Sequence, residues 1–171
     1  MANLSCRRFS SHFWAAAFFL TRAVRSIERK IRGRYYKTRR GLAIDRTADL
    51  GSTHLDLNNI SIGRGSYVKS GEILSGNATV RIGEFCAIGN NVAIKARTHD
   101  RQSPTKLTPG HTNQRIEKDI VIGDRVWIGD NVFIREGIVI GDDVIIGANS
   151  VVTRSVPKGA VVGGVPARNI A

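Results

Sequence analysis

An aliphatic residue recurs every six positions along most of this chain, and this period limits the fold more than any other feature. The cleanest run is Ile122, Ile128, Ile134, Ile140, Ile146 and Val152, and the fifth residue of each of these hexads is small or β-branched. A period of six matches neither the 3.6-residue turn of an α-helix nor the two-residue alternation of a simple β-strand. The period instead indicates a short flat strand followed by a tight corner.

Three such units close a triangular coil of about eighteen residues, and successive coils stack at the ~4.8 Å spacing of β-ladders. One aliphatic residue per hexad points inward, and the Gly that often follows it relieves crowding at the corner. Asn and Asp residues occupy the turn positions that their local hydrogen bonding favours. The sequence therefore predicts an all-β fold, a left-handed parallel β-helix, as a domain over residues 41–171 that begins near residue 42.

The repeat is interrupted twice. The phase assigns Leu74 to the inward column, and a slip of two residues follows at Gly76-Asn77. The pattern then disappears over 100–119, a polar segment that contains Pro104 and Pro109. Because long loops in compact domains are usually functional or disordered, this segment is predicted to be an excursion from the coil.

The N-terminal segment 1–40 is predicted to be a basic amphipathic helical arm. It holds eleven Lys and Arg residues and one acid, whereas the rest of the chain is almost neutral. Apolar residues spaced three and four apart predict a helix over 10–34 with a single apolar stripe. The arm has three readings: contact with an anionic membrane surface, packing against the β-helix or the arms of other subunits, and a nucleic-acid tail. Since the main domain is not basic, no nucleic-acid partner is predicted.

The longest apolar run, residues 13–20, is too short for a membrane-spanning helix, which needs ~20 residues. The two cysteines, Cys6 and Cys86, form no CxxC motif, which favours a reducing compartment. Cys86 lies at a small-residue position of the repeat and is predicted to be a buried packing residue. We therefore predict a cytoplasmic protein, with peripheral contact to the inner face of the membrane as the alternative that the arm allows.

His99 lies where the last regular strand gives way to the excursion. An imidazole has an unperturbed pKa of ~6.5, so a histidine at the mouth of a loop on a rigid scaffold suits acid–base chemistry. Position alone leaves open that His99 is a solvated loop residue. The other histidines, His12, His54 and His111, are predicted to be surface residues. Their spacing lacks the three-histidine pattern of zinc-binding β-helices, so no metal is predicted.

Three motifs carry a resemblance to a known family. They are IGDRVWIG at residues 122–129, IGANSVVT at residues 146–153 and GVPAR at residues 164–168. The segment 120–170 resembles the C-terminal half of the hexapeptide-repeat O-acetyltransferases, the group of galactoside, maltose and nodulation-factor enzymes. Residues 62–99 also line up with that group without a gap.

The resemblance implies a homotrimer whose active sites lie between neighbouring β-helices, with acetyl-CoA along a groove. It implies that His99 is the general base, taking the proton from an acceptor hydroxyl that attacks the thioester. The residues implied to bind acetyl-CoA are Trp127, Gly129, Gly147, Ala148, Thr153, Arg154 and Arg168. Corner sterics explain the small residues equally well, and a surface role remains open for Trp127 and Arg168.

The resemblance also assigns acceptor binding to Tyr67, Lys69 and Asn77. Galactoside-type enzymes carry Asn at the position of Lys69 and Asp at the position of Asn77, so the acceptor is predicted to differ from a simple galactoside. The predicted function is O-acetylation of a sugar hydroxyl in the synthesis of a surface polysaccharide, such as capsule, O-antigen or exopolysaccharide. The alternatives are N-acetylation of an amino sugar and a β-helix scaffold without enzymatic activity.

Overall fold

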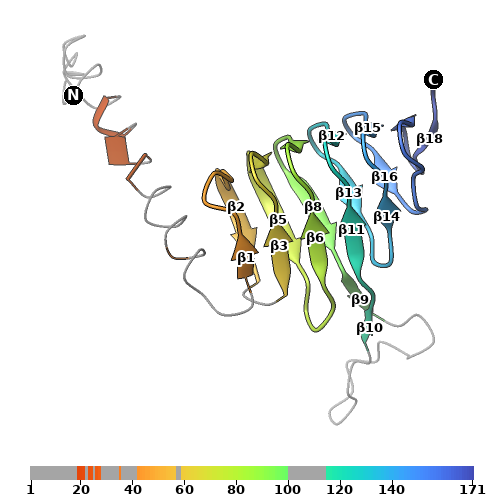
Figure 1. Ribbon diagram of the computed structural model, residues 1–171, viewed down its shortest axis with the longest axis horizontal. Helices are drawn as coiled ribbons and strands as arrows, with labels where there is room; N and C mark the ends of the chain where they lie inside the picture. Colours follow the sequence, from red (N-terminus) through yellow and green to blue (C-terminus); the bar gives the residue numbers. More distant parts are fainter. Residues whose placement is uncertain are drawn as a thin grey trace, which may run out of the picture.

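The computed structural model describes residues 42–56, 59–99 and 115–171, together with 19–21, 23–24, 26–27 and 35 of the N-terminal arm. The described arm residues all have helical backbone, as predicted for those that fall within 10–34, and the rest of the predicted helix lies outside the described residues. The remainder is a stack of β-coils (Figure 1). No helix in the described part of the chain is long and apolar enough to span a membrane.

The coils form three sheets that the chain visits in turn. Sheet A contains β1 (Leu42–Ile44), β3 (Ile60–Ile62), β6 (Val80–Ile82), β11 (Ile120–Ile122) and β14 (Val139–Ile140). Sheet B contains β4 (Tyr67–Val68), β7 (Ala87–Ile88), β12 (Trp127–Ile128), β15 (Ile145–Ile146), β17 (Val161–Gly163) and β18 (Arg168–Asn169). Sheet C contains β2 (Ser52–Leu55), β5 (Ser70–Leu74), β8 (Val92–Lys95), β13 (Phe133–Ile134) and β16 (Val151–Val152). All pairings within these sheets are parallel except β17 with β18, which confirms the predicted all-β parallel β-helix.

The strand register reproduces the period and its interruptions. Leu42 pairs with Ile60, eighteen residues later, as a coil of three hexads requires. Ile60 pairs with Val80 across twenty residues, which confirms the predicted slip of two. Val80 pairs with Ile120 across forty residues, so the excursion leaves the coil and the chain returns to the same stacking position.

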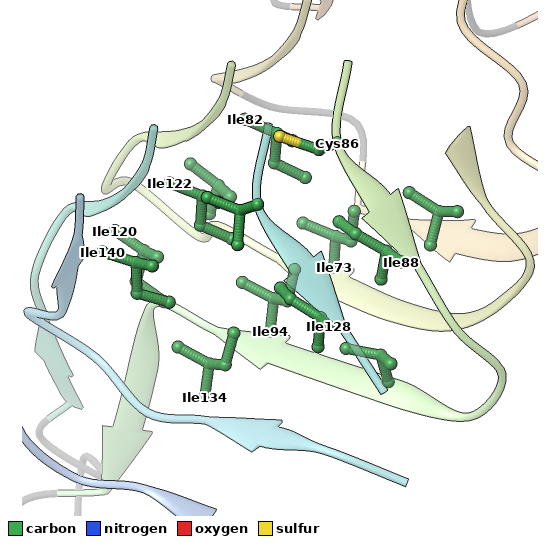
Figure 2. Close-up of a cluster of buried hydrophobic side chains, with 14 of the residues drawn as sticks. Ile73, Ile82, Cys86, Ile88, Ile94, Ile120, Ile122, Ile128, Ile134 and Ile140 are labelled. Carbon is green, nitrogen blue, oxygen red and sulfur yellow. The ribbon is translucent and has the colours of Figure 1, made fainter. Parts of the chain in front are cut away.

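The core is a set of stacked aliphatic columns inside the coils (Figure 2). The six aliphatic residues spaced six apart from Ile122 to Val152 are all buried, and each is at most 1% exposed. The small or β-branched residues at the fifth positions are buried as well, so each hexad turns a second residue inward besides the predicted one. Cys86 is 1% exposed and packs in the same interior, as predicted.

The assignment of Leu74 to the inward column is wrong. Ile73 is fully buried and pairs with Ile94, whereas Leu74 is half-buried on the outer side. The corner between Val68 and Ile73 is one residue shorter than the matching corner between Ile88 and Ile94. The inward position therefore comes one residue earlier than the six-residue phase predicts.

Three edges run along the coil where one sheet turns into the next. The charged edge joins sheets A and B at residues 63–66, 83–86, 123–126 and 141–144. The groove edge joins sheets B and C at residues 69, 89–91, 129–131 and 147–150. The hairpin edge joins sheets C and A at residues 75–79, 96–99, 115–119, 135–138 and 153–155.

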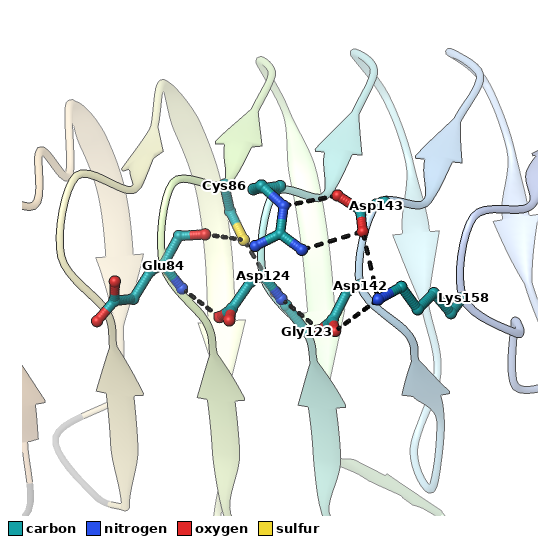
Figure 3. A network of polar contacts seen from close by, with 8 residues as sticks. Glu84, Cys86, Gly123, Asp124, Asp142, Asp143 and Lys158 are labelled. Atoms are coloured by element: carbon teal, nitrogen blue, oxygen red, sulfur yellow. Dashed lines mark hydrogen bonds and ion pairs between the residues drawn. The ribbon is translucent and has the colours of Figure 1, made fainter.

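Polar ladders stabilise the edges. On the charged edge the N–H of Glu84 donates to Asp124 at 2.8 Å, and the N–H of Asp124 donates to Asp142 at 3.0 Å (Figure 3). Arg125 donates to both carboxylate oxygens of Asp143, at 2.6 and 3.0 Å. The Cys86 thiol donates to the carbonyl of Gly123 at 3.1 Å in the same view. Each coil therefore supplies acceptors for the backbone donors of the coil before it.

On the groove edge, three asparagines with positive φ stack directly on one another. Asn91, Asn131 and Asn149 have φ of 52°, 58° and 60°, a region that Asn tolerates better than most residues. The side-chain amide of Asn91 donates to Asn131 at 3.0 Å, and that of Asn131 donates to Asn149 at 3.1 Å. The ladder fixes the spacing of the coils beside the candidate site.

Candidate functional site

A groove of about 400 Å³ runs along the outer face of sheet B and onto the groove edge. Tyr67, Ala87, Trp127 and Ile145 form its floor and walls, since they pair in register on four successive strands and point outward. Trp127 is 58% exposed and stands above the small Ala87. The groove thus has aromatic walls on either side of a shallow floor, a shape that suits an elongated ligand with apolar stretches.

The groove brings together six of the predicted site residues: Tyr67, Lys69, Trp127, Gly129, Gly147 and Ala148. The two glycines in this set, Gly129 and Gly147, differ in the space that the structure leaves for a side chain. A Cβ on Gly129 would lie 2.6 Å from the backbone nitrogen of Ala148, so stacking of the coils excludes any side chain there. A Cβ on Gly147 would meet nothing closer than the carbonyl oxygen of Val162, at 3.6 Å. Corner sterics therefore account for the glycine at position 129 but not for the one at position 147, which also lines the groove.

The charged residues of the groove lining are Lys69 and Asp130. The N–H of Asn90 donates to Asp130 at 2.6 Å, and the amide of Asn90 lies 3.2 Å from the second carboxylate oxygen. These hydrogen bonds hold the pKa of Asp130 below its ordinary value, and the Lys69 ammonium acts in the same direction. Asp130 is therefore ionised in the neutral range.

His99 lies on a different edge of the β-helix. It ends β9 (Arg97–His99), which pairs antiparallel with β10 (Arg115–Glu117), so that His99 lies opposite Arg115. This two-stranded ribbon leaves the hairpin edge, on the opposite side of the coils from the labels of β12 and β15 in Figure 1. The His99 side chain is exposed. The described segments on either side of the predicted excursion thus pair as two antiparallel strands, and residues 100–114 lie outside the described residues.

One hydrogen bond and one ion pair tie the base of this hairpin to the preceding coils, which are themselves joined by a hydrogen bond from Gly76. The amide of Asn77 donates to Glu117 at 2.7 Å, and the N–H of Gly76 donates to Asp56 at 2.9 Å. Arg97 lies 4.0 Å from the same Asp56 carboxylate. Asn77 therefore lies beside the hairpin and is separated from Tyr67 and Lys69 within one chain.

The other predicted cofactor-binding residues do not line the groove. Thr153 and Arg154 lie where sheet C ends, on the hairpin edge, and Arg154 is exposed. Arg168 is exposed on β18, two strands beyond β15 in sheet B, past the C-terminal end of the groove. The predicted site residues therefore fall into two groups, one on the groove and one on the hairpin edge, with Arg168 apart from both.

Sequence reasoning missed Ala87, Ile145 and Asp130 as groove residues. Ala87 and Ile145 directly precede inward aliphatic residues, as Trp127 does, so the six-residue period contained the signal for their shared face. Among the remaining histidines, His54 is exposed on β2 as predicted, and His12 and His111 lie outside the described residues. No group of three His, Cys, Asp or Glu side chains in the described part is arranged to hold a metal ion.

Comparison with known proteins places this geometry among hexapeptide acetyltransferases. Residues 119–154 match the family described as bacterial transferase hexapeptide (six repeats). A crystal structure of the hexapeptide-repeat-containing acetyltransferase VCA0836 from Vibrio cholerae is 30% identical, with a TM-score of 0.61 over 76% of this chain and 69% of that chain. The chain belongs to the hexapeptide-repeat acetyltransferase family. The same Vibrio protein in complex with acetyl-CoA superposes with a TM-score of 0.70 at 29% identity, covering 85% and 76% of the two chains.

Two further members of the hexapeptide-repeat acetyltransferase family are informative. Galactoside O-acetyltransferase of Escherichia coli K12 is 36% identical over 113 residues, which are 66% of this chain and 54% of that protein. The chain thus spans about half the length of this curated relative. The polySia-specific acetyltransferase NeuO is 28% identical, with a TM-score of 0.60 over 75% of this chain and 60% of that chain.

Proposed function

We propose that this protein is an acetyl-CoA-dependent O-acetyltransferase that modifies a sugar hydroxyl of a surface polysaccharide. The main support for the proposal is the groove beside Trp127, which is lined by the small residues Gly129, Gly147 and Ala148. The pantetheine arm of acetyl-CoA is long, narrow and largely apolar, so it fits a trough with an aromatic wall and a floor of small residues. The relatives named above support this reading, since one is bound to acetyl-CoA and others acetylate galactosides or polysialic acid.

In this proposal His99 is the general base. Its imidazole takes the proton of the acceptor hydroxyl while the hydroxyl oxygen attacks the thioester carbonyl carbon. The tetrahedral intermediate collapses to the acetyl ester, and the CoA thiolate leaves and takes up the proton from the imidazolium. A positioned base of this kind contributes about 10²- to 10⁴-fold to the rate.

We further propose that the active site is completed by a second copy of the chain in a homotrimer. The acetyl-CoA groove and His99 lie on different edges of one β-helix, so one copy does not bring the thioester and its base together. Contact between the hairpin edge of one copy and the groove of the next is heterologous, and such contacts close into a ring of three when each copy is rotated by a third of a turn. A ring of three places each His99 against the neighbouring Trp127 and brings Asn77, Thr153 and Arg154 to the same groove.

A mixing experiment tests the shared site. His99→Ala removes the base, and Ala148→Trp fills the groove of the other component. Each variant alone is expected to be inactive, whereas co-expressed variants are expected to recover activity, because a hairpin with His99 then meets an open groove. Recovery that is no greater than the sum of the separate variants would show that each chain carries a whole site.

Turnover itself is tested by following CoA release with a thiol reagent in the presence of labelled acetyl-CoA and a panel of sugar acceptors. Acetylation of an amino group rather than a hydroxyl would favour the N-acetyltransferase alternative. No transfer to any acceptor would favour a scaffold role. Unchanged turnover by His99→Ala would contradict the general-base assignment.

The N-terminal arm is proposed to bring the enzyme to its glycan acceptor at an anionic membrane surface. The described stripe residues Leu20, Val24 and Ile27 are 67%, 47% and 56% exposed, so they offer apolar area for such contact. Packing of the arms between subunits is the alternative use of the same stripe. Flotation of the full-length chain with phosphatidylglycerol vesicles tests the first role, and absence of binding by an intact trimer would favour the second.

A further inference from the structure

Lys69 is an exposed cation at the N-terminal end of the groove. Its backbone is fixed within the coil, because its N–H donates to Ile88 at 3.0 Å and its carbonyl accepts from Ser52 at 2.9 Å. The side chain follows β4 and lines the groove together with Tyr67 and Trp127. The scaffold therefore places this ammonium group at a defined end of the candidate site.

The Lys69 ammonium has no ion-pair partner among the described residues, unlike many of the cations on the other faces. Lys95 pairs with Glu72 at 2.6 Å on sheet C, and Arg64 pairs with Glu84 at 2.9 Å on the charged edge. Asp130, the acid of the groove lining, is close enough for the Lys69 ammonium to help lower its pKa, but it is hydrogen-bonded by Asn90 and forms no ion pair with Lys69. An unpaired cation in a groove has electrostatic capacity left for an anionic ligand.

The position of Lys69 separates it from the phosphates of acetyl-CoA. Gly89, Gly129 and Gly147 follow Lys69 along the groove edge, one coil apart, so Lys69 lies three coil spacings, ~14 Å, from Gly147. The exposed Arg168 lies beyond the opposite, C-terminal end of the groove. If the nucleotide end of acetyl-CoA lies toward Arg168, the acetyl group points toward Lys69 and the acceptor meets it there.

The walls beside Lys69 are spaced for a sugar ring. Tyr67 and Trp127 flank Ala87 on neighbouring strands, so the two aromatic side chains start ~9.6 Å apart, twice the strand spacing. The methyl group of Ala87 leaves the gap between them open. A sugar ring, which presents apolar C–H groups on its faces, fits between two such aromatic side chains with its charged substituent next to the ammonium.

We propose that Lys69 selects an acidic glycan as the acceptor by pairing with a carboxylate on the sugar that is acetylated or on its neighbour. This inference rests on the proposed acetyltransferase function and names its substrate class. A single ammonium matches the single charge of a carboxylate, whereas a doubly charged phosphate is usually held by several cations or by the fork of an arginine. Uronic and sialic acids are the sugars with this chemistry.

The test compares acetylation of oligogalacturonate and of oligomeric sialic acid with acetylation of their carboxyl-reduced forms. The full-length wild type is expected to prefer the carboxylated acceptor by about 10- to 100-fold in kcat/KM, as a hydrogen bond between charged groups provides. Lys69→Met removes the charge and keeps the length, and is expected to abolish this preference with the KM for acetyl-CoA unchanged. Lys69→Arg should retain most of it.

Lys95→Met is the matched control, because it removes a cation on sheet C and is expected to leave the acceptor preference unchanged. Equal acetylation of both acceptor forms by wild type, a Lys69→Met variant that keeps the preference, or a preference for phosphorylated sugars would overturn the inference alone. A change confined to the KM for acetyl-CoA would assign Lys69 to the cofactor and overturn it too. No acetylation of any acceptor would overturn the proposed function, and this inference with it.

Discussion

Gly129 and Gly147 form a matched pair that separates scaffold sterics from ligand binding. Both residues lie on the groove edge, both follow an inward isoleucine, and neither has a positive φ. They differ in the coil that stacks on them. A methyl group on Gly129 would lie 2.6 Å from the Ala148 nitrogen and 2.9 Å from its Cα. A methyl group on Gly147 would have no heavy atom closer than the Val162 carbonyl oxygen, at 3.6 Å.

The magnitudes follow from these contacts. Backbone atoms must shift to admit Gly129→Ala, and overpacking of this kind costs about 1–3 kcal/mol. For a domain of this size each kcal/mol lowers Tm by about 2–4 °C, so we expect a decrease of about 2–12 °C. Gly147→Ala meets no clash and restricts the unfolded chain, which is expected to stabilise the fold by about 0.4–1 kcal/mol.

Thermal unfolding followed by circular dichroism measures both variants, and acetyl-CoA kinetics measure the second effect. Gly147→Ala is expected to raise the KM for acetyl-CoA at an unchanged or higher Tm, because it adds a methyl group to the lining of the groove. A Gly129→Ala protein as stable as wild type would refute the steric reasoning. Equal losses of Tm for the two variants would show that the stacking coil does not distinguish them.

Three other predictions concern the scaffold. Ile134→Ala, at a fully buried position, is expected to cost about 2–5 kcal/mol in urea unfolding; a cost below 1 kcal/mol would mean that the column collapses around the gap. Hydrogen bonds from Arg125 lower the pKa of Asp143, so their stabilisation is present above the unfolded Asp value of ~3.9 and is lost as the pH falls below it. The Tm difference between wild type and Asp143→Asn should therefore shrink between about pH 5 and pH 3, and a difference that is independent of pH would contradict this. Burial raises the pKa of the Cys86 thiol, so in a Cys6→Ser background the native protein should react with a thiol reagent only as fast as it unfolds, and rapid labelling would contradict the packing described.

The six-residue period was enough to predict most of the fold, because each inward residue occupies the same environment in every coil. The same steric constraint recurs at that position in every coil, and the same type of residue satisfies it each time. The aliphatic columns, and the excursion that interrupts them, could therefore be recognised in the sequence. Leu74 was misplaced for a local reason. A corner shortened by one residue leaves two adjacent aliphatic residues, Ile73 and Leu74, and composition does not tell which one turns inward.

The candidate site was predictable as a set of residues but not as an arrangement. The motifs that contain Trp127 and Gly147 resemble family motifs closely enough to select them. Their separation from His99 arises from which edge each hexad occupies after the two interruptions, and this requires the observed register. The surroundings of Lys69 were equally out of reach, because Asp130 receives its hydrogen bonds from Asn90, a residue forty positions away.

Both insertions into the coil leave at the hairpin edge, and stacking resumes unchanged after each. The two extra residues at Gly76-Asn77 and the long excursion after His99 both rejoin sheet A in register. Because the entropy of closing a loop grows only with the logarithm of its length, about 0.6 kcal/mol for each doubling, this edge accepts new sequence at little cost to the scaffold. Transplanting a relative's hairpin between Ala96 and Lys118 should therefore leave the stacking of the coils and their thermal stability little changed, which makes this edge the place where the scaffold best tolerates new sequence.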